Sequence, residues 1–244
     1  MNLALFDLDG TLTQTNRVDG TCFVRALADA LGISGVETDW TRYTHSTDSG
    51  LAWEICRESH GCEPEAAELD RFKARFLELL AEEAERDPEA FAPTPGAATA
   101  LGRLRAEPGW AVAVATGCYR GSALLKLKRA GLDLDGVPFA CADDLLTREE
   151  ILTAARDAAT ARWSPDGFAR VVYVGDGLWD VRACARLGLP FIGIGSGARE
   201  TALRAAGASH VLPDLADYSR LLRGLAEAAV PSPDPNLDHA HVLN

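Results

Sequence analysis

The chain has 244 residues, 47% of them hydrophobic and 25% charged, and carries a formal net charge of −12. This composition is ordinary for a globular protein with a buried core, and the acidic balance argues against nucleic acid or an anionic membrane as a partner. No stretch reaches the ~18 apolar residues of a membrane span, and no basic segment followed by an apolar one opens the chain. We therefore expect a cytoplasmic protein whose six scattered cysteines are free thiols.

The order of the predicted elements indicates a parallel sheet. Short apolar runs alternate with helical stretches, and most runs are apolar on both faces, which is typical of strands buried between two layers of helices. We expect strands at residues 3–6, 110–115, 137–140, 171–174, 191–194 and 210–212. Gly131 and Gly188 stand where two of the helices should end. The predicted fold class is α/β, with a Rossmann-like parallel sheet core.

The alternation of strands and helices breaks after the first strand. Residues 14–92 contain no convincing strand, whereas 22–31 and 66–84 have the apolar periodicity of helices. Two prolines and a glycine at 93–96 then mark the return to the sheet. We therefore predict a sheet core and an inserted helical cap, divided as residues 1–13 and 93–228 for the core and 14–92 for the cap.

The end of the chain is expected to lack structure. Residues 229–244 include three prolines in alternate positions, at 231, 233 and 235. We expect a disordered tail there, with His239 and His241 solvated instead of bound to a metal.

Two aspartates follow the first strand directly. Ligands bind beyond the carboxyl ends of the strands in an open α/β sheet, so Asp7 and Asp9 should stand at the mouth of a site. A calcium loop of the EF-hand type would need Gly at its sixth position and Glu at its twelfth, but Gly10 is fourth and Val18 is twelfth. The apolar run that leads into the motif also disfavours a surface turn.

Two further strands end in polar motifs. Thr116 and Gly117 follow the second strand and can bind a phosphate through the hydroxyl and free backbone N–H groups, although a helix cap explains Thr116 equally well. Asp176 and Asp180 follow the fourth strand, where Asp180 can also stabilise the start of the next helix.

All four aspartates should converge if the first and fourth strands are neighbours. Two like charges 4 Å apart cost roughly 4 kcal/mol at an effective dielectric of 20, so such a cluster needs a cation or takes up protons. Mg²⁺, which binds a few carboxylates together with substrate phosphate, suits the site. The sequence thus predicts a magnesium site, which would supply the local positive charge that an acidic protein needs to bind a phosphate.

The ordered motifs carry a family resemblance. D-L-D-G-T-L stands at residues 7–12, A-T-G at 115–117 and V-G-D-G-x-x-D at 174–180. Together they resemble the haloacid dehalogenase superfamily, and in particular its phosphatase branch, which includes phosphoglycolate phosphatases and β-phosphoglucomutase. The helical insertion at 14–92 matches the cap of that family.

The resemblance implies a Mg²⁺-dependent phosphatase that acts on a small phosphorylated metabolite through an aspartyl-phosphate. Asp7 would be the nucleophile, and Asp9 the general acid and later the general base. Thr116 and Gly117 would bind the phosphoryl oxygens. The metal would be held by Asp7, by Asp9 through its backbone carbonyl, and by Asp176, with Asp180 in support.

The resemblance also implies a basic residue, usually Lys, near the start of the helix before the fourth strand. The familiar K-P-x-P stretch is absent, and Arg148 is the candidate in its place. A guanidinium can contact two phosphate oxygens at once, although a surface ion pair with Glu149 or Glu150 is the alternative. Lys126 and Lys128, on the helix after the second strand, are expected to be solvated.

The cap offers weaker candidates. A polar segment at residues 44–50 lies between helical stretches and could close over a substrate, although an ordinary polar loop is as consistent. His45, Thr47 and Asp48 are candidates for contacts with the leaving group, as is Arg17 just past the first motif. Cys118 is expected near the site in a structural role.

Other activities share parts of this pattern. A phosphomutase or phosphotransferase differs only in what attacks the aspartyl-phosphate, and the sequence does not separate it from a hydrolase. A haloacid dehalogenase in the strict sense lacks the second aspartate, so Asp9 argues against it. A receiver-like domain has no cap and carries its phosphorylated Asp after a later strand, and an inactive module should have lost Asp7 or Asp9. We expect a monomer or a homodimer.

Overall fold

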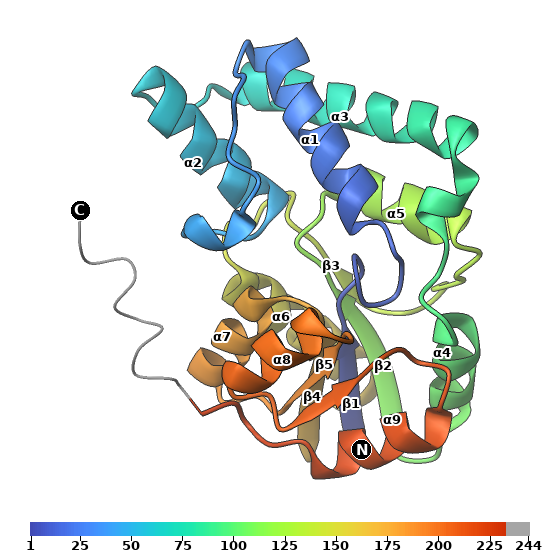
Figure 1. Cartoon of the computed structure of the whole chain (residues 1–244). Coiled ribbons are helices and arrows are strands. Elements are labelled where there is room, and N and C mark those ends of the chain that lie inside the picture. The colour runs from blue at the N-terminus through green and yellow to red at the C-terminus, as the bar shows by residue number, and fades with distance from the viewer. Residues whose placement is uncertain (233–244) are drawn as a thin grey trace.

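Six parallel strands form one sheet in the order β3-β2-β1-β4-β5-β6 (Figure 1). The computed structural model describes residues 1–232, and it confirms the α/β class. The strands are β1 (Asn2–Phe6), β2 (Trp110–Ala115), β3 (Phe139–Ala140), β4 (Arg170–Gly175), β5 (Phe191–Ile194) and β6 (His210–Leu212). This order places β1 at the centre, between β2 and β4, as in other doubly wound sheets.

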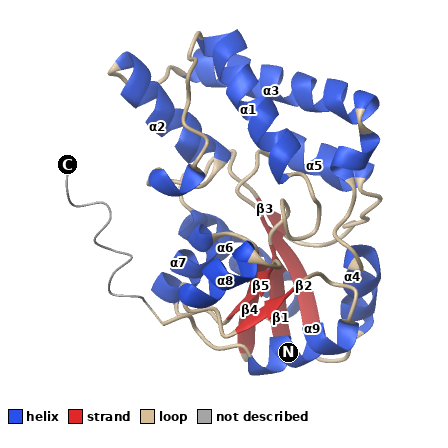
Figure 2. Cartoon of the chain, viewed as in Figure 1, coloured by secondary structure: helices blue, strands red, loops and turns tan. Residues whose placement is uncertain are grey.

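Helices cover both faces of the sheet (Figure 2). One face packs on α4 (Ala97–Ala106), α5 (Arg120–Arg129) and α9 (Tyr218–Glu227), and the other on α6 (Arg148–Trp163), α7 (Leu178–Leu187) and α8 (Ala198–Ala205). The side chains of β1 alternate between the two cores: Ala4 and Phe6 face the first, and Leu3 and Leu5 face the second. Burial on both faces explains why the strand is apolar throughout.

The insertion after β1 is helical, as predicted. It contains α1 (Asn16–Leu31), α2 (Asp48–His60) and α3 (Ala66–Arg86), with short 3₁₀ turns at Trp40–Arg42 and Pro88–Phe91. These helices lie beyond the carboxyl ends of the strands (Figure 1) and have a core of their own, in which the ring of Phe23 meets those of Phe72 and Phe76 edge-on. The residue boundaries of a separate core and cap stay a prediction.

Several elements differ from their predicted extents, β3, α1 and α2 among them. Strand β3 has two residues where four were expected, because Pro138 has no amide hydrogen to donate to β2. Helix α1 begins at Asn16, six residues before the apolar periodicity does, and Gly20 within it lies against the ring of Trp40. Helix α2 begins inside the segment expected to be a loop, because Thr47 caps its first turn.

Gly188 ends α7 in a left-handed conformation, and Gly131 follows the last turn of α5 with a positive φ, as expected for helix stops. All six cysteines are free thiols. From residue 233 on, the expected tail at 229–244, with His239 and His241, lies outside the described residues. Among residues 1–232, no helix combines the length and the apolar character needed to cross a membrane.

Candidate active site

The carboxyl ends of β1, β2 and β4 meet at one edge of the sheet. Parallel pairing sets Phe6 level with Val114 and with Val174, so the residues that follow these strands emerge side by side. A cavity of about 210 Å³ opens there, and its lining includes Asp7 and Thr116, which directly follow β1 and β2, and residues of α1. This is where ligands bind in an open α/β sheet.

Three buried carboxylates form the centre of this edge. Oxygens of Asp7, Asp176 and Asp180 lie within 4.8 Å of one another, and none of the three residues is more than 5% exposed. Burial is the main cause that raises the pKa of Asp7 well above its usual range; the Arg148 charge opposes it, and the neighbouring aspartates add to it. Burial likewise raises the pKa of Asp176 to about 7. A cation that compensates this charge therefore stabilises the ionised cluster.

Arg148 stands between two of these carboxylates. Its Nη1 donates to Asp7 Oδ1 at 3.1 Å, and its Nε lies 3.4 Å from Asp180 Oδ1. The residue opens α6, where Thr147 Oγ1 accepts from the backbone N–H of Glu150 and the Glu150 carboxylate accepts from that of Thr147. This capping box fixes the start of α6 and directs Arg148 to the sheet edge. Arg148 is 6% exposed, so the alternative of a surface ion pair is wrong.

The turn after β2 brings Gly117 against Arg148. A Cβ on Gly117 would lie 2.9 Å from Nη2 of Arg148 and 2.9 Å from the carbonyl oxygen of Ser46, so the close approach of these groups requires glycine. Thr116 is buried, and its Oγ1 accepts from the backbone N–H of Cys118 at 3.2 Å. Both residues line the cavity beside Arg148. Their phosphate-binding role stays a prediction.

Two residues that the sequence analysis did not single out contact Asp176. Asn16 Nδ2 donates to Asp176 Oδ2 at 2.9 Å, and Arg199 forms an ion pair with the same carboxylate. Gly10 passes so close that a Cβ on it would lie 2.0 Å from Asp176 Oδ2, and its φ of 78° also favours glycine. The Asp176 carboxylate therefore contacts Asn16 and Arg199 and packs closely against the backbone of Gly10.

The donor set at this edge fits a hard divalent cation. Mg²⁺ prefers carboxylate oxygens, and the three clustered aspartates offer them within a short span. The prediction treated a metal as the cation that balances the cluster, yet two guanidinium groups already pair with it, those of Arg148 and Arg199. The fit to Mg²⁺ therefore rests on the chemistry of the donors and not on unbalanced charge alone.

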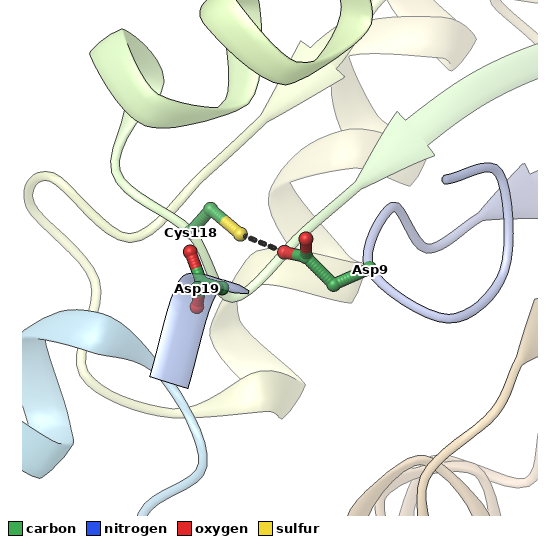
Figure 3. Close-up of side chains that lie close together, drawn as sticks. All are labelled: Asp9, Asp19 and Cys118. Carbon is green, nitrogen blue, oxygen red and sulfur yellow. Dashed lines mark hydrogen bonds between the residues drawn. The ribbon is translucent and has the colours of Figure 1, made fainter. Parts of the chain in front are cut away.

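The Asp9 side chain belongs to a second polar group, so only three of the four aspartates converge as expected. Figure 3 shows Asp9 facing Cys118, from the turn after β2, and Asp19, from α1. The Cys118 thiol donates to Asp9 Oδ2, and the Thr15 hydroxyl donates to Asp9 Oδ1. Cys118 thus has the structural place near the site that the sequence predicted.

Lys126 is the cation of this second group. Its side chain is 0% exposed, its Nζ lies 2.8 Å from Asp9 Oδ2, and it also forms an ion pair with Asp19. The prediction that Lys126 is solvated is therefore wrong, whereas Lys128 is exposed as predicted. Burial opposes the ionisation of Asp9, but the Lys126 charge and the surrounding hydrogen bonds outweigh it and lower the pKa of Asp9.

Two of the cap candidates are fixed by the core. Asp48 lines the cavity, and its Oδ2 accepts from the backbone N–H of Tyr119 at 2.8 Å. Thr47 does not line it: its hydroxyl caps α2 and donates to the carbonyl oxygen of Leu146 at 2.6 Å. The start of α2 therefore docks on the loops after β2 and β3.

The other two candidates lie outside the cavity that holds Asp7. His45 lines a neighbouring cavity of about 300 Å³, and Arg17 is exposed and lines a third of about 400 Å³. Trp40 and Trp179, which no motif marks, line both the first and the second cavity. A tryptophan in a helical segment gives the same signal whether it faces a core or a substrate, so the sequence could not single them out.

A family model matches most of the chain. The model for haloacid dehalogenase-like hydrolases matches residues 1–188. The chain is a member of the haloacid dehalogenase-like hydrolase family. None of the curated proteins matches it.

Solved structures share the fold of this hydrolase. A hydrolase from Pseudomonas syringae is 22% identical, with a TM-score of 0.71 over 93% of this chain and 100% of that one. CbbY from Rhodobacter sphaeroides in complex with phosphate is 24% identical, with a TM-score of 0.64 over 92% and 99%. β-Phosphoglucomutase from Clostridium difficile is 15% identical, with a TM-score of 0.67 over 92% and 96%. At these identities the likeness concerns the fold.

Proposed function

We propose that this hydrolase is a Mg²⁺-dependent phosphatase that cleaves a small phosphate monoester through an aspartyl-phosphate on Asp7. The observation that carries the proposal is the pairing of the buried Asp7 carboxylate with the Arg148 guanidinium, beside the turn at Thr116 and Gly117. A fixed guanidinium next to a carboxylate nucleophile is what a phosphoryl group needs in order to approach that carboxylate. The phosphate bound to CbbY and the likeness to β-phosphoglucomutase agree with this chemistry.

The metal would be held by Asp7, Asp176 and the backbone carbonyl of Asp9, with Asp180 in support. When bound, Mg²⁺ would screen the charge of the phosphate from that of the nucleophile. Asn16 would hold Asp176 in place through its hydrogen bond.

The chain's own residues would act in two half-reactions. In the first, an Asp7 oxygen attacks phosphorus, the bond from phosphorus to the leaving oxygen breaks, and Asp9 gives a proton to that oxygen. Asp9 would take up this proton when the substrate binds, because the negative charge of the phosphate opposes the effect of Lys126 on its pKa. In the second, water attacks phosphorus, the bond to Asp7 breaks, and Asp9 takes up the proton of the water. Arg148, Thr116 and Gly117 would hold the phosphoryl oxygens throughout.

The leaving group would lie under the helical insertion, in the cap of residues 14–92. Phe23, Trp40 and Leu51 give the cavity apolar walls there, and Asp48 adds a carboxylate. These groups suit a small leaving group with an apolar face and a hydroxyl that can donate to Asp48. A sugar phosphate that takes the phosphoryl group in place of water would make the protein a phosphomutase instead.

A substrate screen tests the proposal. Phosphate release from a panel of phosphorylated metabolites should require Mg²⁺ and should vanish in EDTA. Product analysis by mass spectrometry distinguishes hydrolysis from phosphoryl transfer to a second substrate molecule. Release that does not depend on a divalent cation would contradict the proposal.

Thermal stability should depend on pH and metal in a defined direction. Burial is the main cause that raises the pKa of Asp19 to about 6 and that of Asp176 to about 7, from an ordinary value of 3.8. The folded chain therefore binds protons more tightly than the unfolded chain, and this stabilisation, full below pH 3.8, is lost as pH passes through 6 and 7. In EDTA, Tm should fall between about pH 5 and about pH 8. Added Mg²⁺ should restore it at the higher pH.

Asp176→Asn is the matched control for this titration. It should flatten the upper part of the pH dependence in EDTA and reduce the gain in Tm from Mg²⁺. A Tm that rises with pH in EDTA over the same range would contradict the assigned direction.

A further inference from the structure

The buried ammonium of Lys126 has no part in the reaction proposed above. An ammonium loses its hydration when it is buried, and this costs several kcal/mol unless close counter-charges compensate. Asp9 and Asp19 provide them, and Nζ also lies 3.2 Å from the sulfur of Cys118. Within residues 1–232, Lys126 is the one lysine that is buried.

Lys126 joins three segments that are distant in the sequence. It lies on α5, Asp9 on the loop after β1, and Asp19 on the first turns of α1 in the insertion. Three hydrogen-bond donors contact the Asp9 carboxylate: Thr15 on one oxygen, and Cys118 and Lys126 on the other. Of these donors, Lys126 carries the positive charge, and charge-assisted hydrogen bonds are the stronger ones.

Removing the Lys126 charge would leave two carboxylates close together with no cation between them. The carboxylates of Asp9 and Asp19 lie within 4.8 Å of each other, so without the ammonium between them they would repel. Asp9 lies three residues beyond the end of β1, and its carboxylate is held by the side-chain contacts described above. Lys126 is thus the group that sets the orientation of the Asp9 carboxylate.

We propose that Lys126 is a positioning residue for the acid–base group of this hydrolase: it fixes Asp9, and Asp19 on α1 anchors it from the side of the insertion. The inference rests on the proposed function, because Asp9 must act as acid and base for its orientation to matter. Both proton transfers need the Asp9 carboxyl within hydrogen-bond reach of the reacting oxygen. A turned carboxylate would therefore slow both half-reactions, except where the leaving group needs no proton.

Two substrates separate this role from a structural one. p-Nitrophenolate leaves without protonation, so with p-nitrophenyl phosphate Lys126→Met should slow only the hydrolysis of the aspartyl-phosphate. In a two-step mechanism kcat and KM then fall together, by about 10- to 100-fold, while kcat/KM changes little. With an alkyl phosphate, where Asp9 must protonate the leaving group, kcat/KM should itself fall by about 10-fold or more. A burst of p-nitrophenolate, close to one equivalent per enzyme, should precede the steady state.

Lys128→Met is the control, since Lys128 is exposed on the same helix. This variant should leave kcat and KM unchanged for both substrates. If Lys126→Met alone does not fold, the double variant Lys126→Met/Asp19→Asn also removes the negative charge of Asp19, which would otherwise be buried without its partner. The double variant should show the same difference in kcat/KM between the two substrates. An equal loss of kcat/KM on both substrates, an unchanged KM with a lower kcat, or no loss at all would overturn the role of Lys126. No phosphate release by the native enzyme would overturn the proposed function, and this role with it.

Discussion

Asp7→Asn should abolish phosphate release, lowering kcat by roughly 10⁴- to 10⁶-fold on any substrate that the native enzyme hydrolyses. An amide has no charged oxygen with which to attack phosphorus. Because burial disfavours the ionised form of Asp7, the loss of its charge should leave Tm unchanged or raise it. Steady-state kinetics and thermal unfolding of the same preparation measure the two effects.

A loss of activity without a loss of stability makes this prediction specific. Asp166→Asn is the control, since Asp166 is an exposed acid in the loop after α6, and it should alter neither quantity. Native activity in Asp7→Asn would contradict the assigned nucleophile. A large drop in Tm would instead indicate that Asp7 acts mainly in the fold.

Arg148→Met should lower kcat/KM by about 10³-fold or more, the usual cost of removing an arginine that stabilises a phosphoryl group in transfer. It should also destabilise the metal-free protein, by about 3–5 kcal/mol at most, because Asp7 and Asp180 lose their partner in a buried place. Arg148→Lys keeps the charge but not the two-pronged geometry, so it should recover part of the stability and less of the activity. Kinetics and chemical denaturation in EDTA measure these outcomes.

The matched control for this arginine is Arg186→Met. Arg186 lies on α7, is 63% exposed and pairs with Glu149 at the surface. Such pairs contribute little to stability, so this variant should behave as the native protein does. If Arg148→Met kept its native kcat/KM, Arg148 would not be the basic residue of the site.

Much of the fold follows from local pattern. β2, β5 and β6 begin and end at the residues predicted for them. Strands that are buried on both faces form nearly continuous apolar runs, so the length of the run indicates the length of the strand. Asp7 and Asp176 were predictable for the same reason: each follows a buried strand directly, and parallel pairing brings those strand ends together. The position of Arg148 was harder to predict, because the direction of its side chain depends on the capping box that Thr147 and Glu150 form at the start of α6.

The second polar group could be predicted only in part. Lys126 falls three residues after Ala123 and four before Ala130, which are both buried, so helical spacing places it on the inner face of α5. The identity of its partners depends on how α1 docks against α5, and no short-range pattern encodes that contact. For the same reason, the turn of Asp9 toward Asp19 could not be read from a motif that sets Asp7 and Asp9 two residues apart.

The most direct test asks whether Asp7 itself carries the phosphoryl group. Enzyme turning over a substrate is quenched in acid and reduced with borohydride, which converts an aspartyl-phosphate to homoserine, and its peptides are mapped by mass spectrometry. Conversion should occur at Asp7, should be absent from Asp9, Asp176 and Asp180, and should require substrate and Mg²⁺. Conversion at another aspartate, or none at Asp7 while phosphate is being released, would contradict the assigned chemistry.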